Sequence, residues 1–540
     1  MSGPGAGKAP AAVPAGGAQG GAAQGRSVPG GSVPGGEVKN RGMITVCLMA
    51  ATIMQALDTT IANVALPYMQ GSLSATIDQV NWVLTSYIVA AAIMTAPVGW
   101  LAMRFGTKKV LIVCAAGFTV ASMLCGIAQS ITDMVLYRLL QGVFGAALVP
   151  LSQAVMMAIY PPERRGQAMA VWGMGVMIGP IMGPTLGGWL TDTLSWHWVF
   201  FVNLPFGIAT VLGLAAFMQE TPTQPSMRFD WFGFAALSIG IGAAQLMLDR
   251  GESLGWFDSA EIRAEAIVAA AGLWYFVVHS LTAERPFIPI QIFRDTNFSV
   301  GVVFMFVVGI ILLATMALVT PFVQNVIGYP VMQAGLLLGT RGIGTMAAMM
   351  VTGRLLGRID ARLMILTGLI LSTLPLVFMT GMTADTPAST IVWTSIMQGV
   401  GLGFVFVPLN TVAFATLPAR YRTEGTAVWT LIRNLGSAVG VSIVIAQLTS
   451  TTTLMHARLT ESLTPWNLGL QFPTAALVDP ATTTGRALLE QLVTAQAVII
   501  AYANDFRLMT FISLAALPLL LLIRVGKTPA KVDPAHAVAD

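Results

Sequence analysis

Apolar segments long enough to cross a lipid bilayer recur along this chain of 540 residues. A helix needs about 20 residues to span the hydrocarbon core of a membrane, where only helices and closed barrels satisfy every backbone polar group. The short alternating segments of a barrel are not found in the sequence. With 55% hydrophobic and 10% charged residues, the chain is also too apolar for a soluble globular protein. The sequence therefore predicts an all-α polytopic membrane protein.

Fourteen transmembrane helices are predicted from the apolar windows. Their expected ranges are 43–66, 79–102, 110–129, 134–159, 167–190, 198–218, 231–249, 265–283, 298–321, 334–353, 363–384, 390–416, 425–448 and 505–524.

The basic residues predict the orientation of these helices. Most of the 28 Lys and Arg residues fall on one side if the amino terminus is cytoplasmic, as the positive-inside rule expects. The loops on that side contain Arg104, Lys108, Lys109, Arg164, Arg165, Arg354, Arg358, Arg362, Arg420 and Arg422. Both termini are therefore expected in the cytoplasm. The membrane topology then explains the excess of basic residues, which does not indicate nucleic-acid binding.

An internal repeat predicts the architecture. The segment QGVFGAALVPLSQ starts at Gln141, QGVGLGFVFVPLNT starts at Gln398, and AVW recurs at 170–172 and 427–429, all with an offset of 257 residues. Helices 1–6 thus correspond to helices 9–14 in the same membrane orientation, and helices 7 and 8 are inserted between them. This 6+2+6 arrangement with pseudo-two-fold related halves is typical of transporters that rock two bundles around a central site.

The expected organisation has five parts. They are a disordered cytoplasmic tail (1–42), a six-helix bundle (43–218), a two-helix hairpin with its linkers (219–297), a second bundle (298–524) that includes a periplasmic loop (449–504), and a cytoplasmic tail (525–540). The loop contains RALLEQLVTAQAVII, whose apolar residues Leu488, Leu489, Leu492, Val493, Ile499 and Ile500 follow a helical spacing. This segment either packs against the transporter or docks a partner.

One carboxylate, Asp58, lies deep inside the first predicted span and is expected to be the only acid so placed. A charge near the middle of a membrane helix costs about 2.5–3.5 kcal/mol, so such acids mark ion and proton pathways. At 1.5 Å per residue, Arg138 in the fourth span and Arg341 in the tenth can reach the same depth. Asp58 either forms a fixed structural ion pair with Arg138 or exchanges a proton during transport. We favour the proton-coupling interpretation.

Other polar side chains in the spans are candidates to line a substrate cavity. They are Thr59, Asn63, Gln141, Arg341, Gln398, Asn410 and Arg433. The chain also has 30 methionines, whose flexible side chains suit varied apolar ligands but serve equally well in ordinary packing.

The fifth span contains GVMIGPIMGPTLGG, in which Gly175, Gly179, Gly183 and Gly187 recur at every fourth position. Glycines at this spacing make one helix face bare, which allows a neighbouring helix to approach closely. Pro180 and Pro184 lie between them and are expected to kink the helix.

These motifs resemble those of the major facilitator superfamily, in particular its fourteen-span drug:proton antiporter group of the EmrB and QacA type, and most closely the EmrB type. The resemblance rests on LDTTIANVALP in span one, GWLAMRFGTKK in the loop after span two, YRLLQGVFGAALVP in span four and GPIMGPTLGG in span five.

The resemblance implies a role for particular residues. Asp58 would be the coupling acid and Arg138 its motif arginine; Gly175, Gly179, Pro180, Gly183, Pro184 and Gly187 would form the antiport motif, and Gly99, Arg104, Gly106 and Lys108 a gate motif in the inner loop. Met103 stands where the loop motif usually has an acid, so a charge relay through that position is not expected.

The resemblance further implies a function: proton-coupled efflux of hydrophobic or amphipathic compounds by alternating access across a bacterial inner membrane. It implies a periplasmic adaptor of the EmrA type and a TolC-like outer-membrane channel as partners, and no cofactor besides the proton gradient. The alternatives are a stand-alone exporter or a symporter of one metabolite. A membrane-embedded enzyme or sensor would need a catalytic dyad, a metal cluster or a signalling domain, and the sequence indicates none.

Overall fold

The computed structural model describes Gly3 and residues 40–221, 223, 228–283, 286, 288–463 and 482–523. The predicted tail 525–540 and nearly all of the tail 1–42 lie outside these residues. Within the described part of the chain, all regular secondary structure is helical, apart from an isolated bridge between Leu356 and Ile359.

Seventeen α-helices follow one another along the described residues. They are α1 (Arg41–Ser72), α2 (Ile77–Thr95), α3 (Val98–Phe105), α4 (Thr107–Gly126), α5 (Ile131–Gly145), α6 (Leu148–Ile159), α7 (Arg165–Thr193), α8 (Trp198–Phe201), α9 (Asn203–Phe217), α10 (Trp231–Arg250), α11 (Ala260–Thr282), α12 (Thr296–Pro321), α13 (Val331–Leu355), α14 (Ala361–Met379), α15 (Ala388–Ala415), α16 (Arg422–Ser462) and α17 (Thr483–Ala515).

The number of membrane spans agrees with the prediction. In the described residues, 12 helices are long and apolar enough to cross a membrane, and two bent pairs raise the number to 14. One pair is α2 with α3, which meet at 55° around Pro97, a residue that cannot donate a backbone hydrogen bond. The other lies within α7, which bends by 42° between Gly183 and Thr185, where Pro184 was expected to kink it.

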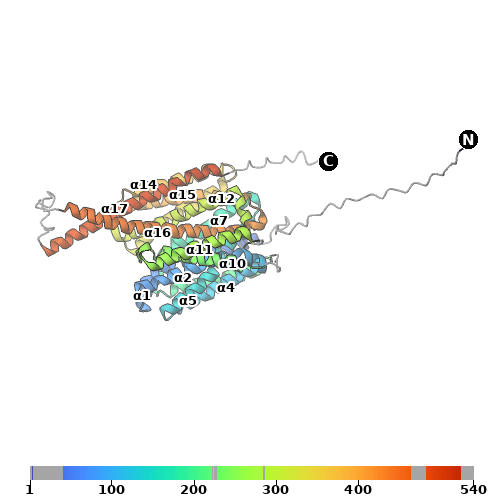
Figure 1. Cartoon of the computed structure of the whole chain (residues 1–540), viewed down its shortest axis with the longest axis horizontal. Coiled ribbons are helices and arrows are strands. Elements are labelled where there is room, and N and C mark those ends of the chain that lie inside the picture. The colour runs from blue at the N-terminus through green and yellow to red at the C-terminus, as the bar shows by residue number, and fades with distance from the viewer. Residues whose placement is uncertain are drawn as a thin grey trace.

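The helices form two bundles with an inserted hairpin, as the repeat predicts (Figure 1). In the first half α1 packs against α7 and α9, and in the second half α12 packs against α16. The hairpin α10–α11 lies against α2 and α16, and so touches both halves. The basic loops between α3 and α4, α6 and α7, α13 and α14, and α15 and α16 share one end of the molecule, called the basic end below.

The last two helices differ from the prediction. Helix α16 continues to Ser462 and α17 begins at Thr483, so the predicted loop 449–504 is helical on both sides of residues 464–481, which lie outside the described part. The two helices pack on each other and project from the bundle, at the left of Figure 1. Helix α17 begins 22 residues before the predicted start of the final span at residue 505, because it continues through polar residues that no apolar window includes.

The apolar face of α17 also differs in part from the predicted one. Val493 is buried as expected, together with Ala497 and Ala501, whereas Leu488 and Leu492 are 36% and 49% exposed. The contact with α16 is therefore made mainly by small side chains.

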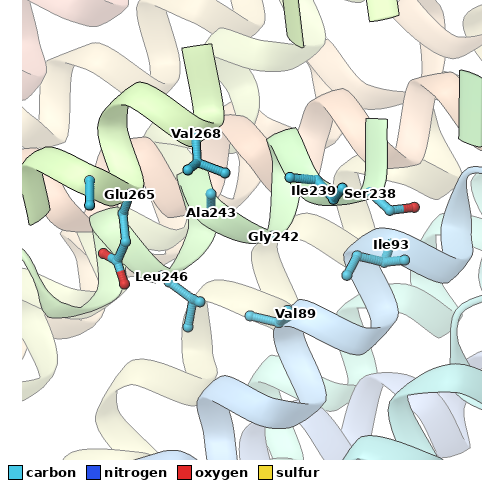
Figure 2. Close-up of a pocket in the computed structure, with 10 residues that line it drawn as sticks. Val89, Ile93, Ser238, Ile239, Gly242, Ala243, Leu246, Glu265 and Val268 are labelled. Carbon is cyan, nitrogen blue, oxygen red and sulfur yellow. The ribbon is translucent and has the colours of Figure 1, made fainter. Parts of the chain in front are cut away.

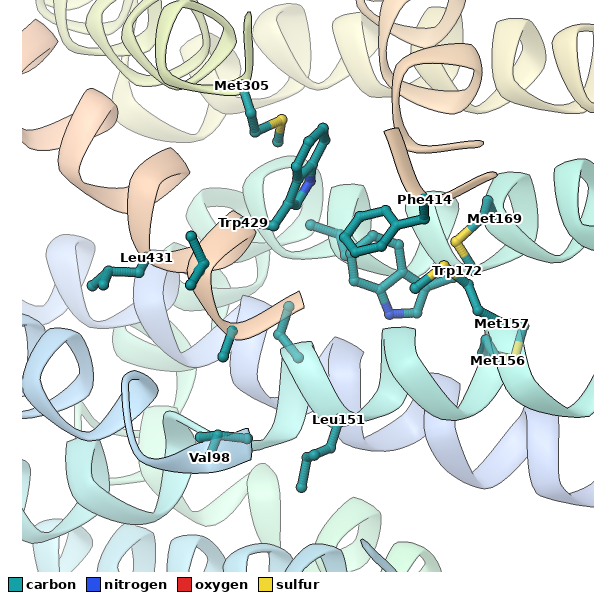
Figure 3. Packing of buried hydrophobic residues seen from close by; sticks show 14 of the residues in the cluster. Val98, Leu151, Met156, Met157, Met169, Trp172, Met305, Phe414, Trp429 and Leu431 are labelled. Atoms are coloured by element: carbon teal, nitrogen blue, oxygen red, sulfur yellow. The ribbon is translucent and has the colours of Figure 1, made fainter. Parts of the chain in front are cut away.

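One hydrophobic core joins the two halves near the basic end (Figure 3). Trp172 of α7 stacks on Phe406 of α15, with ring centroids 6.0 Å apart and an interplanar angle of 14°. Its repeat equivalent, Trp429 of α16, packs against Phe414 and Phe298 within the second half. The basic end is thus closed by aromatic and methionine side chains from both bundles.

Buried polar side chains also meet across this core. Gln153 of α6 donates from Nε2 to Oδ1 of Asn410 in α15 at 2.6 Å, and both side chains are fully buried. The adjacent VPL segments, at 149–151 and 407–409, are offset by 258 residues, so Asn410 aligns with Ser152 and not with Gln153. The contact connects the two halves near the basic end.

Replacement of one partner of this pair should shift the protein away from the closed basic end. In Gln153→Leu, Asn410 would be left buried without its partner, at a cost of about 1–3 kcal/mol. Spin labels at the exposed positions Arg164 and Arg358, one on each half, should show a longer mean distance in Gln153→Leu by double electron–electron resonance. Gln153→Leu/Asn410→Leu removes both polar groups and should return towards the wild-type distance, and a distance unchanged in the single variant would contradict the assignment.

Candidate functional site

Asp58 lies at the centre of a buried polar cluster in the first half. Its Oδ2 accepts a hydrogen bond from Nη1 of Arg138 at 2.6 Å, and its Oδ1 accepts one from Nε2 of Gln141 at 2.8 Å. The side-chain amide of Asn203 is 3.3 Å from the same Oδ1. Asp58 is 0% exposed and Arg138 1% exposed. Helix α1 thus supplies the carboxylate, and α5 and α9 bring three donors to it.

The guanidinium of Arg138 is held on every side. It donates from Nε to the Val83 carbonyl at 3.1 Å and from Nη1 to Oε1 of Gln141 at 2.8 Å. Its Cζ lies 4.6 Å from the ring centroid of Tyr87 and 5.5 Å from that of Phe200. These hydrogen bonds and ring contacts offset part of the desolvation that makes a buried ion pair costly.

The predicted pairing of Asp58 with Arg138 is therefore present in the structure, but two neighbours were missed. Asn203 is the one amide side chain in the apolar segment 198–218, and it could have been found as an isolated polar residue within a span, the signal that identified Asp58. Tyr87 directly follows Thr85 and Ser86 in span two, so no such signal distinguishes it.

The second half contains a neutral copy of this site. Thr315 and Gln398 follow Asp58 and Gln141 by the repeat offset, and Nε2 of Gln398 is 3.5 Å from Oγ1 of Thr315. The position equivalent to Arg138 is occupied by Ser395. The amide contact is therefore retained in both halves, while the carboxylate and its guanidinium partner occur in the first half alone.

The glycine face of α7 packs on the turn of α1 that carries Asp58. A methyl group added at Gly179 would lie 2.2 Å from the carbonyl carbon of Ala56, and one at Gly183 would lie 2.1 Å from Oγ1 of Thr60. Oγ1 of Thr60 also donates to the Gly179 carbonyl at 2.9 Å. The predicted close approach is present, and its partner helix is α1.

Other side chains of α7 contact the second half. Ile181 fills the space beside Gly342 of α13, and Gly173 lies against Met349 of α13 and Phe406 of α15. One helix therefore touches both the Asp58 turn and the interface between the halves. Helix α7 can therefore transmit a displacement of α1 at Asp58 to that interface without any other element.

The predicted gate motif lies at the junction of α3 and α4. Gly99 faces Glu424 of α16, where an added methyl group would lie 2.9 Å from Cγ of Glu424, and Lys108 donates to the Ala215 carbonyl at 3.0 Å. Gly106 adopts a φ of 91°, which favours glycine, and Arg104 is partly exposed. Met103 supplies no acid here, and Gly99 of the motif lies against the backbone and Cγ of Glu424 from the other half.

The candidate cavity residues fall into two groups. Gln141, Gln398 and Asn410 are buried and hydrogen-bonded between helices, so in this conformation they line no open space. The others are accessible: Asn63 is exposed, and Thr59, Arg341 and Arg433 are partly exposed. Arg341 contacts the Leu312 carbonyl of α12, and its predicted depth, level with Asp58, stays a prediction.

Asp58 is not the only buried acid among the described residues, although the prediction concerned depth within a span and not burial. Asp505 is 0% exposed in the middle of α17, and Glu424 is 8% exposed in the first turn of α16. Neither carboxylate oxygen of Asp505 has a hydrogen-bond partner among the described residues. Asp505 was placed at a span end because α17 was expected to begin at residue 505.

An apolar pocket of about 490 Å³ lies between α2 and the hairpin α10–α11 (Figure 2). Its wall includes Val89, Ile93 and Val268, and Glu265 is the one carboxylate that lines it. The hairpin thus adds an apolar hollow to the side of the first half.

Comparison with known proteins identifies the family. A model of the Major Facilitator Superfamily matches residues 48–441. The chain is 34% identical to the fatty acid resistance protein FarB of Neisseria gonorrhoeae over 485 residues, which cover 89% of this chain and 96% of that protein. It is 35% identical to the multidrug export protein EmrB of Escherichia coli K12 over 435 residues, which cover 79% and 84%.

A solved structure supports the same fold. The human organic anion transporter MFSD10 superposes with a TM-score of 0.55 at 13% identity, covering 87% of this chain and 99% of that one. The repeat, the fourteen spans and the sequence similarity agree, and the chain belongs to the major facilitator superfamily, with its EmrB-type multidrug exporters among its relatives.

Proposed function

We propose that this protein is a proton-coupled exporter of hydrophobic or amphipathic compounds that works by alternating access in a bacterial inner membrane, with both termini and the basic end in the cytoplasm. The similarity to EmrB and FarB supports export. The observation that supports proton coupling is the buried Asp58–Arg138 pair. The turn of α1 that contains Asp58 packs on α7, and α7 also contacts the second half.

The coupling step follows from the charges at the site. In the structure the basic end is closed and the Asp58 carboxylate is held by Arg138, Gln141 and Asn203. A proton arriving from the opposite side of the membrane neutralises Asp58 and removes its attraction to Arg138. The turn of α1 is then free to shift against α7, and α7 transmits the shift to α13. Release of the proton to the cytoplasm restores the pair.

The tripartite assembly is a separate part of the proposal. EmrB of Escherichia coli is a multidrug export protein. We extend to this chain the partners of the EmrB type, a periplasmic adaptor and an outer-membrane channel. The projecting helices α16 and α17 are the surface of the described residues best placed to meet an adaptor.

Transport by the purified protein tests the function. Proteoliposomes with an imposed pH gradient should accumulate lipophilic dyes, and dye added without a gradient should move protons in the opposite direction, as reported by a trapped pH indicator. Dissipation of the gradient with nigericin serves as the control. Dye accumulation that is equally fast without a gradient, or dye and proton movement in the same direction, would refute antiport.

A further inference from the structure

The second half carries two arginines whose charge is not compensated. Arg341 of α13 and Arg433 of α16 lie in membrane helices, where an uncompensated charge is costly. Among the described residues, no carboxylate lies within 4.0 Å of either guanidinium, the distance that defines the ion pairs of this structure. Arg138, by contrast, is paired with Asp58 at 2.6 Å.

Their hydrogen bonds are also weak. A guanidinium has five N–H donors. In the described residues Arg341 makes one contact, to the Leu312 carbonyl at 3.5 Å, and Arg433 makes one, to Oδ1 of Asn434 at 3.4 Å. Both distances exceed the usual range for N–H···O bonds. Both residues are partly exposed, so their remaining donors are available to a ligand.

The repeat shows that Arg341 occupies a site equivalent to that of Tyr87. Gly142 packs on the Tyr87 carbonyl, and its repeat equivalent Gly399 packs on the Arg341 carbonyl. Tyr87 accepts a hydrogen bond from Gln55, and Arg341 contacts Leu312, which follows Gln55 by the repeat offset. In the first half this site adjoins a carboxylate. In the second half Thr315 occupies the position of that carboxylate. Arg341 therefore lies beside a position that has no negative charge in this half.

The backbone of Arg433 packs on the same part of α12. An added methyl group at Gly309 would lie 2.3 Å from the Arg433 carbonyl oxygen, and Gly309 precedes Leu312 by less than one helical turn. Counted along their helices from the basic end, Arg433 and Arg341 lie about 16 Å and 21 Å deep, close to the middle of a ~30 Å hydrocarbon core. Lipid headgroups do not occupy that depth.

We infer that Arg341 and Arg433 bind the anionic headgroup of an amphipathic substrate, which supplies the negative charge that the second half lacks. The inference rests on the proposed export function and adds a substrate class to it: lipophilic anions with a carboxylate or sulfonate group. Amphipathic cations would be repelled by the same two side chains, so the charge of the headgroup and not the apolar tail decides selectivity.

Matched amphiphiles test this assignment. Binding of decanesulfonate and decyltrimethylammonium, which share a tail and carry permanent opposite charges, is measured by calorimetry on the full-length protein in neutral-lipid nanodiscs, with empty nanodiscs subtracted. Arg341→Gln and Arg433→Gln should each weaken decanesulfonate binding at least tenfold and leave decyltrimethylammonium binding unchanged or stronger. Arg341→Lys should retain most of the affinity. Arg354→Gln, on the same helix at the basic end, is the matched control and should bind as the wild type does.

The outcomes separate this inference from the proposed function. Equal losses for both amphiphiles, or unchanged decanesulfonate binding in both Gln variants, would overturn it. Displacement of decanesulfonate by phosphatidylglycerol added to the nanodiscs would identify a lipid headgroup as the ligand and would also overturn it. Gradient-driven export of lipophilic cations with no anion binding would refute this inference alone, whereas absence of any gradient-driven transport would refute the proposed function.

Discussion

Asp58→Asn is expected to abolish transport driven by a pH gradient. The substitution retains the size of the side chain but removes the negative charge and the titratable proton. Arg138 is then left buried without its counter-charge, which costs about 3–5 kcal/mol of stability. Dye accumulation in proteoliposomes should fall to the level of protein-free vesicles, and the thermal unfolding midpoint of the purified variant should fall as well.

A second variant separates coupling from stability. Asp58→Asn/Arg138→Gln removes both charges, and replacement of both members of a buried pair is far less costly than removal of one. Its thermal stability should recover towards the wild-type value while gradient-driven transport stays absent. Recovery of transport in this double variant would show that the pair is purely structural. Asp385→Asn, in the exposed segment between α14 and α15, is the matched control and should transport normally.

Gly179→Val is expected to have the next largest effect. The first added carbon would already lie 2.2 Å from the carbonyl carbon of Ala56, well inside contact distance, and no side-chain rotation relieves a clash with backbone. Helix α1 must therefore move away at the turn that holds Asp58. We expect transport to fall to background and the unfolding midpoint to drop, since overpacking costs typically 1–3 kcal/mol.

The same helix provides a control for this variant. At Gly188 an added methyl group would have Val64 as its nearest neighbour at 3.9 Å, which is ordinary contact. Gly188→Ala should therefore transport as the wild type does, measured by the same dye assay and matched for protein content. If Gly179→Val transports normally, the close approach of α7 to α1 is not needed for the cycle.

Much of the fold could be predicted because bilayers impose a helix length and because the halves repeat. The QGV and AVW segments showed that α5, α6 and α7 correspond to α15 and α16. The correspondence extends to side chains, because Gln141 contacts Asp58 and Gln398 contacts Thr315 at the equivalent position. The ends of α16 and α17 could not be predicted from hydropathy. Beyond the membrane, polar residues such as Thr483 and Arg486 extend a helix without an apolar signal.

The site could be predicted only in part. The depth of Asp58 and Arg138 follows from helix rise, so their pairing was accessible to sequence reasoning. The Gln153–Asn410 contact was not, because neither hydropathy nor the repeat indicates which side chains of opposite halves meet. The burial of Asp505 was not predicted either, because it depends on how α17 packs against its neighbours.

In the proposed cycle, the presence of Thr315 where the first half has Asp58 would limit the energy available for transport. A threonine does not titrate, so the duplicated site would exchange one proton and not two. One charge moved through a membrane potential of 100 mV releases about 2.3 kcal/mol. At about 1.4 kcal/mol per factor of ten, that sustains a concentration ratio of roughly fortyfold for an uncharged solute. The single carboxylate of the repeat would therefore limit the electrical contribution to substrate extrusion, to which any pH gradient adds.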